Sequence, residues 1–373
     1  MKRSTLMRVL WLVRNNLTRQ PGGDTVQILQ TAAALRRIGL TVDLCERPDP
    51  DLRGYDCVHL FHLDRLWENE AHCRRIAARG VPAVLSTIYW PGDDYDRGGR
   101  TGFQGFLART FGSEAYRSLR VAQRWAMALR SGRGAHGRWR PTVSFRHSAR
   151  FVLRTVSVLL PNSRLEQEVI ERYFGDVPPA VVVPNAADSS LFRPPARAWP
   201  EGRDGVLCVG RIEPRKNQLA LIRAMRGSGI RLTLVGKAGQ LSKSYYRRCV
   251  REAGDEVQFI SLVEPAVLRD LYGAARVHAN VSWYETPGLV SLEAALCGCS
   301  LVVTPGGSTR EYFRNDACYA RPEDPAAIRA AVEAAMTRPP DATLAARIAR
   351  EYTWKAAAER TRDAYELAVA RRR

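Results

Sequence analysis

Short apolar runs alternate with amphipathic segments along most of the chain. Four such runs in the amino-terminal half predict buried parallel strands, at 8–13, 40–45, 55–61 and 82–90. The amphipathic segments 25–39 and 73–80 have the periodicity of helices. Strands that alternate with helices predict a doubly wound parallel sheet, whose ligands bind at the carboxyl ends of the strands. Gly22 and Gly23 follow the first predicted strand, so we expect them to contribute to a binding site.

The amino-terminal half continues up to a linker, after which the same alternation begins again. A strand at 157–163, a helix at 164–174 and a further strand from 180 lead into a linker with several prolines. Five later runs predict strands, at 205–210, 230–235, 257–261, 276–282 and 300–305. Four segments predict helices, at 218–225, 244–254, 265–275 and 289–298. A last helical stretch from about 342 to 370 is long enough to cross between domains.

The length of the chain agrees with two domains. A chain of 373 residues is too long for one ordinary core and suits two α/β domains of about 180 residues each. We place the boundary in the linker, which gives an amino-terminal domain over 1–185 and a carboxyl-terminal domain over 186–350. Residues 351–373 then form a separate terminal helix.

Positive charge is concentrated in one segment. The formal net charge is +19, and residues 97–154 contain thirteen arginines, no lysine and one acidic residue, Glu114. This arginine-rich segment predicts an anionic partner, either an anionic membrane surface or a phosphate-bearing acceptor. Nucleic acid is not expected, because the chain has no recognised nucleic-acid-binding signature. A solvated arginine-rich face without a partner is the alternative.

Cysteines and hydropathy favour a cytoplasmic protein. The eight cysteines form no C-x-x-C pair, which is typical of a reducing compartment. The apolar run Val9 to Val13 is too short for a signal peptide, and no run has the length of a membrane-spanning helix. We expect the protein in the cytoplasm, with at most peripheral contact at the inner face of the membrane.

The motif VGRIEPRKN has the chemistry of a diphosphate site. Arg211 follows a predicted strand and offers a planar fork of donors, and Lys216 follows five residues later as a mobile point charge. Cations near the start of a helix are mildly unfavourable because of the helix dipole. Their presence there therefore favours a role in ligand binding over the role of ordinary surface residues.

The motif ETPGLVSLEAALCG predicts the second part of that site. Glu285, Thr286 and Pro287 form a loop that would hold a donor sugar, and Glu293 lies in the helix that follows, where a carboxylate could accept hydrogen bonds from a ribose. The helix start faces an anion or sugar hydroxyls with the N–H groups of Gly288, Leu289 and Val290. The alternative is that both glutamates are ordinary loop and helix-surface residues.

Together these motifs resemble the retaining glycosyltransferases called group one or family four. PGGDTVQILQTAAALRRIGLTVDL is similar to the first glycine loop and helix of that family, and VVPNAADSSLFRP to its linker signature. VGRIEPRKN resembles its phosphate site, and VHANVSWYETPGLVSLEAALCGCSLVVTPGGSTREYF its two-glutamate motif. EYTWKAAAERTRDAYEL resembles the closing helix, which returns to the amino-terminal domain. The resemblance covers nearly the whole chain.

The resemblance implies a GT-B fold, in which two Rossmann-like domains face a cleft between them. It implies an NDP-sugar bound to the carboxyl-terminal domain, with Arg211 and Lys216 on the diphosphate, Glu293 on the ribose and Glu285 at the sugar. It also implies retention of anomeric configuration, in which the leaving phosphate accepts the proton of the acceptor and no protein nucleophile is needed. No cofactor and no metal are expected, and we interpret the aspartate pairs at 49/51 and 94/96 as turn residues.

The chain departs from the family pattern at three places. Pro287 stands in TPG where the family has GFG, which removes one backbone N–H near the sugar. PNA replaces PNG in the linker signature. Tyr89 stands where many members carry a histidine, so His59 or His62 are candidates to substitute for it.

The resulting hypothesis is transfer of a sugar from an NDP-sugar to a hydroxyl of a glycan or lipid-linked acceptor, in the synthesis of cell-surface polysaccharide or glycolipid. Two alternatives use the same fold. One is a nucleotide-sugar epimerase or a phosphorylase, and the other is a catalytically degenerate subunit that binds glycans or acts as a scaffold.

Overall fold

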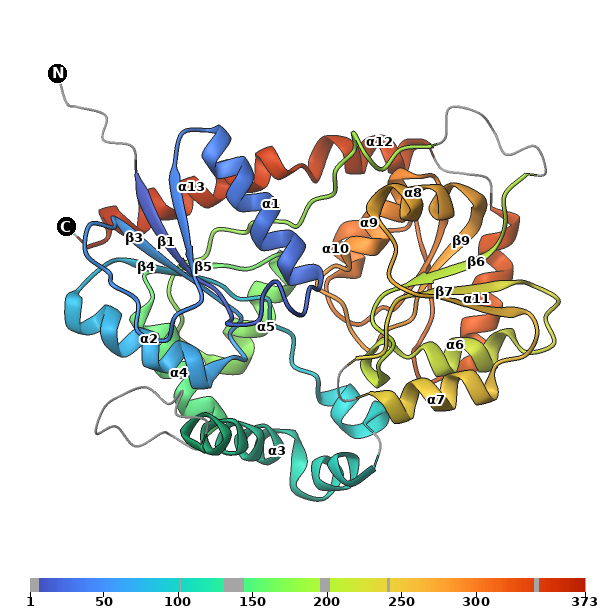
Figure 1. Cartoon of the computed structure of the whole chain (residues 1–373), viewed down its shortest axis with the longest axis horizontal. Coiled ribbons are helices and arrows are strands. Elements are labelled where there is room, and N and C mark those ends of the chain that lie inside the picture. Colours follow the sequence, from blue (N-terminus) through green and yellow to red (C-terminus); the bar gives the residue numbers. More distant parts are fainter. Residues whose placement is uncertain are drawn as a thin grey trace. The chain divides into compact units, whose positions relative to one another are not determined.

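The computed structural model describes residues 7–100, 102–130, 144–194, 202–239, 242–338 and 342–372 (Figure 1). Residues 101 and 131–143 of the arginine-rich segment lie outside the described residues, as do residues 195–201 of the predicted linker. The chain forms two compact units. The first comprises Met1–Pro91, Leu107–Pro184 and Trp354–Arg373, and the second comprises Gly92–Phe106 and Asn185–Thr353. Each contains a parallel sheet flanked by helices, so the predicted doubly wound α/β class is confirmed.

The sheet of the first unit has the strand order β2-β1-β3-β4-β5, with every neighbouring pair parallel. Its strands are β1 (Arg8–Leu12), β2 (Thr41–Cys45), β3 (Cys57–Phe61), β4 (Ala83–Ser86) and β5 (Val158–Leu160). Its helices are α1 (Gly23–Arg37), α2 (Leu66–Arg79), α4 (Phe145–Thr155), α5 (Arg164–Phe174) and α13 (Trp354–Ala370), together with residues 107–130 of α3 (Gly102–Arg130). All residues of β3 are buried, as expected of an inner strand covered on both faces.

The helix at the carboxyl-terminal end, α13, is part of the first unit. It packs against α1 and β5. On its buried side, the Tyr365 hydroxyl accepts a hydrogen bond from Trp11 Nε1 of β1 at 2.9 Å and meets Nδ1 of His59 of β3 at 2.7 Å. These buried polar groups satisfy one another, so α13 completes the core of the unit that begins the chain.

The sheet of the second unit has the order β11-β10-β9-β6-β7-β8 and is also parallel throughout. Its strands are β6 (Asp204–Val209), β7 (Leu232–Val235), β8 (Val257–Ile260), β9 (Ala275–Asn280), β10 (Ser300–Val303) and β11 (Cys318–Tyr319). Its α-helices are α6 (Gln218–Met225), α7 (Lys243–Glu252), α8 (Pro265–Ala274), α9 (Leu289–Leu296), α10 (Thr309–Phe313), α11 (Pro325–Thr337) and α12 (Ala342–Glu351).

The long final helix predicted over 342–370 is two helices, α12 in the second unit and α13 in the first. Tyr352 lies between them. Its ring stacks on Tyr312, with centroids 4.7 Å apart, and its carbonyl accepts a hydrogen bond from Ala187 N–H at 3.2 Å. These contacts hold the chain at the point where it leaves α12.

Two predicted elements differ in extent from the structure. Helix α2 begins at Leu66 and not at residue 73. The prediction missed its first turns because they carry polar residues that are nevertheless buried. One of them, Asn69, donates from Nδ2 to the carbonyls of Phe61 and His62. The strand predicted from residue 180 forms only an isolated bridge between Ala180 and Leu159.

The segment 92–106 belongs to the second unit, although it lies within the range predicted for the amino-terminal domain. It contains a short π-helix, η1 (Tyr95–Gly99), beside the ring of Trp283. A Cβ atom at Gly98 or Gly99 would overlap that indole, so these glycines permit the close packing. Helix α3 (Gly102–Arg130) follows and bends at Gly112, where φ is 80°.

None of the described helices combines the length and the apolar composition that crossing a bilayer requires.

Candidate active site

The candidate site of the second unit begins where β6 and β7 end. Gly210 follows β6 and donates its N–H to Val235 O at 2.9 Å. A side chain at Gly236, which follows β7, would overlap the carbonyl oxygen of Gly210. The two strand ends therefore approach closely only because position 236 is a glycine. This turn presents Arg211 at the carboxyl edge of the sheet, where parallel sheets bind ligands.

Lys216 lies in a short 3₁₀ turn, η2 (Pro214–Lys216), between that strand end and α6. The next residue, Asn217, has a φ of 60° and caps the start of α6. Its Nδ2 donates to the carbonyls of Val281 (3.2 Å) and Pro322 (2.6 Å), which fixes the turn against the end of β9. Asn217 therefore positions Lys216.

Glu285 lies in the loop between β9 and α9, and its backbone is held on both sides. Its N–H donates to Gly306 O at 3.1 Å, and its carbonyl accepts from Ser308 N–H at 2.8 Å. A side chain at Gly307 would overlap the Glu285 carbonyl, and φ there is 93°. The glycine pair after β10 thus permits the loop to pair with residue 285.

The structure brings Lys216 and Glu285 together. Lys216 Nζ donates to Glu285 Oε1 in an ion pair whose side chains are only 15% and 8% exposed. Arg215 lies nearby and donates to the carbonyl of Tyr284 at 3.2 Å. Burial alone would raise the pKa of Glu285, but the charges of Lys216 and Arg215 outweigh it and hold that pKa below its ordinary value. Glu285 is therefore a carboxylate, flanked by two cations.

Arg211 is more exposed than its neighbours, with 51% of its side chain accessible. Its Nε lies 3.8 Å from Glu213 Oε2, a loose ion pair at the edge of the turn. The side chain of Lys216 passes within 3.7 Å of the position that a Cβ would take at Gly210, directly beside Arg211 in the chain. Among the described residues, no hydrogen bond joins Arg211 to the Lys216–Glu285 pair.

The loop from Thr286 to Gly288 leads into α9. The Thr286–Pro287 peptide bond is cis, and Asn185 Nδ2 donates to Thr286 O at 3.3 Å. Gly288 has a φ of 87°, and a Cβ there would lie 2.8 Å from Asn280 Nδ2. The N–H groups of Gly288, Leu289 and Val290 stand at the helix start, where such groups have no intrahelical acceptor.

Glu293 lies further along α9, against α8. The Tyr272 hydroxyl donates to its Oε2 at 3.3 Å. Burial raises the pKa of Glu293 to about 7, and the hydrogen bond from Tyr272 only partly opposes this effect. Within the described residues Glu293 makes no hydrogen bond or ion pair with Lys216 or Glu285, and its predicted part at the ribose remains a prediction.

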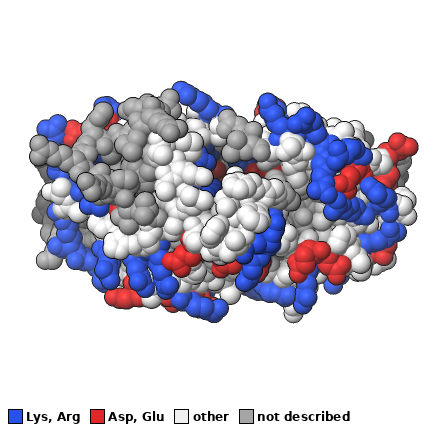
Figure 2. All heavy atoms as spheres, turned by 90° about the horizontal axis from the view of Figure 1, so that it is seen from below, with Lys and Arg blue, Asp and Glu red and all other residues white. Residues whose placement is uncertain are grey.

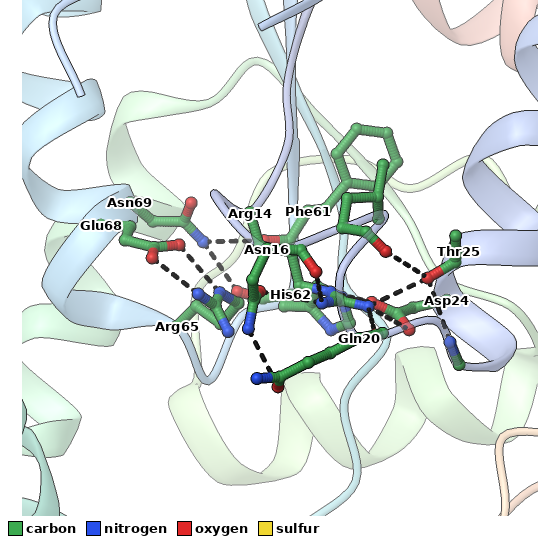
Figure 3. A network of polar contacts seen from close by, with 12 residues as sticks. Arg14, Asn16, Gln20, Asp24, Thr25, Phe61, His62, Arg65, Glu68 and Asn69 are labelled. Atoms are coloured by element: carbon green, nitrogen blue, oxygen red, sulfur yellow. Dashed lines mark hydrogen bonds and ion pairs between the residues drawn. The ribbon is translucent and has the colours of Figure 1, made fainter. Parts of the chain in front are cut away.

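In the first unit, a polar network surrounds the loop that contains Gly22 and Gly23 (Figure 3). Arg14 lies directly after β1, and its guanidinium donates to the loop carbonyls of Asn16 (2.9 Å) and Gln20 (2.7 Å) and to Asp24 Oδ2 (2.6 Å). The N–H of Gly22 donates to Thr25 Oγ1 at 3.1 Å. Gly23 begins α1. Arg14 was not predicted from the sequence, in which its only signal is its position shortly after a strand.

His62 joins this network from the end of β3. Its Nε2 lies 3.2 Å from Asp24 Oδ2 (Figure 3). Burial would raise the pKa of Asp24, but hydrogen bonds from His62 and Arg14 outweigh it, so that pKa lies well below its ordinary value. Among the described residues, the other ring nitrogen of His62 has no hydrogen-bond partner.

The other two candidates for the missing histidine face the core. Tyr89 packs against Phe145 and Phe174 and is buried, and its N–H donates to Glu166 at 2.8 Å. His59 is enclosed by the core, and burial lowers its pKa to about 3. Of the three residues, only His62 reaches the carboxyl edge of the sheet with a partly exposed side chain.

Comparison with solved structures identifies the fold of the protein. The chain superposes on sucrose-phosphate synthase from Thermosynechococcus elongatus with a TM-score of 0.76 at 18% identity, covering 98% of this chain and 100% of that one. It superposes on Anabaena HepE in complex with UDP and glucose with a TM-score of 0.68 at 14% identity, over 96% and 98% of the two chains. The protein therefore has the GT-B fold that the sequence predicted.

Sequence comparison finds similar proteins over part of the chain. Residues 192–352 match the family model of glycosyl transferases group 1, in agreement with the resemblance that the motifs indicated. The D-inositol 3-phosphate glycosyltransferase of Kineococcus radiotolerans is 31% identical over 255 residues, 58% of this chain and 59% of that protein. The glycogen synthase of Mycobacterium tuberculosis is 27% identical over 225 residues, 56% and 53% respectively. The chain thus spans little more than half the length of these two relatives.

Proposed function

We propose that the protein transfers a sugar, with retention of configuration and without a metal, from an NDP-sugar to a hydroxyl of a glycan or lipid-linked acceptor. The observation that carries this proposal is the buried Lys216–Glu285 ion pair at the carboxyl edge of a parallel sheet, with Arg215 beside it and Arg211 exposed at the same turn. Three basic side chains against two carboxylates, Glu285 and Glu213, leave an excess of positive charge, which suits a diphosphate.

Each residue has a distinct part in the proposed reaction. Arg211 and Lys216 stabilise the departing diphosphate, and the N–H groups at the start of α9 add donors for its oxygens. Glu285, held as a carboxylate, accepts hydrogen bonds from hydroxyls of the donor sugar. Glu293 binds the ribose. The leaving phosphate takes the proton of the acceptor hydroxyl, so catalysis rests on orientation and electrostatic stabilisation.

A uridine nucleotide is the first donor to test. Structures of HepE, whose fold this chain shares, are complexes with UDP, with UDP and glucose, and with UDP-glucose. These complexes support a uridine nucleotide as the donor class. The donor sugar is to be determined by experiment.

The first unit supplies the acceptor side in this proposal. Arg14, Asp24 and His62 meet at the carboxyl ends of β1 and β3, an edge at which parallel sheets bind ligands. The name of the Kineococcus relative specifies a phosphorylated inositol acceptor. A phosphate-bearing or lipid-linked acceptor, used in cell-surface polysaccharide or glycolipid synthesis at the inner face of the membrane, suits the basic charge of this chain.

The alternative functions are less well supported. The relatives and neighbours named above are glycosyltransferases and synthases, which does not favour an epimerase or phosphorylase. A degenerate binding subunit would have no need to retain Arg211, Lys216, Glu285 and Glu293 together.

A panel of nucleotides tests the proposal. Ligand that binds only the folded protein raises its melting temperature, so UDP, GDP, ADP and their glucose conjugates are compared by thermal shift. We expect one nucleoside diphosphate to raise the melting temperature, and its sugar conjugate to be slowly hydrolysed by wild type but not by Glu285→Ala or Lys216→Ala. No shift with any nucleotide at millimolar concentration would reject a donor site, and conversion of the sugar conjugate to an isomer would indicate an epimerase.

A further inference from the structure

Helix α3 exposes an unusual number of large apolar side chains. Ten such side chains are exposed in the described residues, and five of them lie on α3: Phe103, Phe106, Phe111, Leu119 and Met127. The three phenylalanines are 73%, 56% and 64% exposed. Single exposed apolar residues are ordinary, but a group on one helix indicates a binding surface.

The first part of α3, residues 102–111, carries its phenylalanines on the outer face. This stretch is continuous helix before the bend at Gly112, so helix geometry alone sets the directions of its side chains. At about 100° per residue, Phe103, Phe106 and Phe111 fall on one half of the helix. Gly105 and Ala108, which are buried, fall on the opposite half. The helix therefore packs through small residues and presents aromatic rings outward, the reverse of an ordinary surface helix.

The same helix is strongly basic. Arg109, Arg120 and Arg124 are exposed on α3, and Glu114 is its one acidic residue. Partial desolvation and the nearby charges of Arg120 and Arg65 lower the pKa of Arg124. On the face seen in Figure 2, basic side chains cover more of the surface than acidic ones.

The combination of phenylalanine rings and arginines on α3 favours one kind of partner over another. In a symmetric contact with a second copy of this chain, basic surfaces would face each other and repel. A bilayer with anionic headgroups accepts both features, because phenylalanine rings enter the boundary between headgroups and acyl chains while arginines contact the phosphates.

We infer that α3 is a membrane-docking helix, which places Phe103, Phe106 and Phe111 in the interface of an anionic bilayer. This inference deepens the proposed function, since a lipid-linked acceptor lies in such a bilayer. Binding to vesicles requires no transfer reaction, so docking and transfer can fail independently of each other.

Co-sedimentation with vesicles tests this inference on the full chain. Wild type is expected to bind vesicles of phosphatidylcholine and phosphatidylglycerol in equal parts, to bind pure phosphatidylcholine much less, and to dissociate as salt is raised. The triple variant Phe103→Ser, Phe106→Ser, Phe111→Ser should lose binding by about tenfold or more. Leu262→Ser, which removes a side chain that is 64% exposed in the second unit, is the matched control and should bind as wild type does.

Three results would overturn the inference. They are absence of wild-type binding to the anionic vesicles, undiminished binding by the triple variant, and a wild-type dimer that the triple variant converts to a monomer, which would assign the surface to a second copy. If the triple variant melts at a lower temperature than wild type, Phe103→Ser alone replaces it, and a measurable loss of binding by that variant is the expected result.

Discussion

Lys216 and Glu285 form a buried ion pair although they lie 69 residues apart in the chain. Each is held by its own backbone contacts, Lys216 through the capping residue Asn217 and Glu285 through pairing with Gly306 and Ser308. The two loops therefore meet with their side chains already oriented. A site arranged in this way before its ligand binds loses little free energy to reorganisation.

The ion pair should be required for stability as well as for activity. In Glu285→Gln, Lys216 and Arg215 keep their charges in a largely buried setting without the carboxylate. We expect the free energy of unfolding to fall by about 3–5 kcal/mol, as for other broken buried pairs. Urea denaturation measures the loss, with the exposed Glu323→Gln as control. A Glu285→Gln variant as stable as the control would show that the pair is not coupled to folding.

In the first unit, the stability of the protein should depend on Asp24 in a comparable way. Arg14 is only 8% exposed at its side chain and pairs with Asp24, so Asp24→Asn leaves a buried guanidinium uncompensated. We expect a loss of about 3 kcal/mol in the free energy of unfolding, against almost none for the exposed Asp49→Asn. Because the pKa of Asp24 is depressed, its contribution is present above about pH 4 and is lost on acidification. The difference between variant and wild type should therefore shrink at low pH, and a pH-independent difference would contradict this account.

The contribution of Glu293 to stability should depend on pH in the opposite direction. Its pKa is raised to about 7 from 4.5, so the folded protein holds a proton that the unfolded chain releases. Stability must then decrease as the pH rises between these two values and level off above the upper one. Glu293→Gln keeps the neutral form at every pH, and it should gain stability relative to wild type as the pH increases from 5 to 8, by about 3 kcal/mol in total. A constant difference between the two proteins would show that Glu293 ionises normally.

Gly307 is expected to be intolerant of any side chain. A methyl group there would overlap the carbonyl of Glu285, and its φ of 93° is unfavourable for residues with a Cβ. Gly307→Ala should reduce nucleotide binding together with stability, because it displaces the loop that carries Glu285. Gly227→Ala is the matched control, since Gly227 also has a positive φ of 66° but no atom within 4 Å of a Cβ at that position. Equal behaviour of the two variants would mean that strain alone, and not the position of Glu285, determines the effect.

Apolar runs were sufficient to predict most of the strands, because parallel strands covered on both faces consist almost entirely of buried residues, as β3 does. Prediction failed where polar residues are buried. The first turns of α2 contain Asn69, whose side chain caps strand carbonyls, so their composition has no apolar periodicity. The placement of residues 92–106 depends on the packing of Gly99 against Trp283, a contact between distant positions that no local pattern encodes.

The candidate site was predictable in part for the same reason. Spacing indicated that Lys216 and Glu285 both follow strands of one sheet, and the carboxyl ends of parallel strands share one edge. Arg215 and Arg14 were missed because a basic residue in a loop carries no signal of burial in a chain with so many arginines. Only tertiary contacts with Tyr284 and Asp24 distinguish them from surface residues.

The central claim is that the cations around Glu285 bind the diphosphate of a nucleotide, and isothermal titration calorimetry with UDP tests it most directly. The matched pair of variants is Lys216→Ala and Lys355→Ala, the latter with a side chain 78% exposed on α13. We predict that Lys216→Ala weakens UDP binding by about tenfold to a hundredfold, the contribution of a hydrogen bond to a charged group. Lys355→Ala should bind as wild type does. If Lys216→Ala binds UDP with wild-type affinity while remaining folded, the assignment of the diphosphate site is wrong.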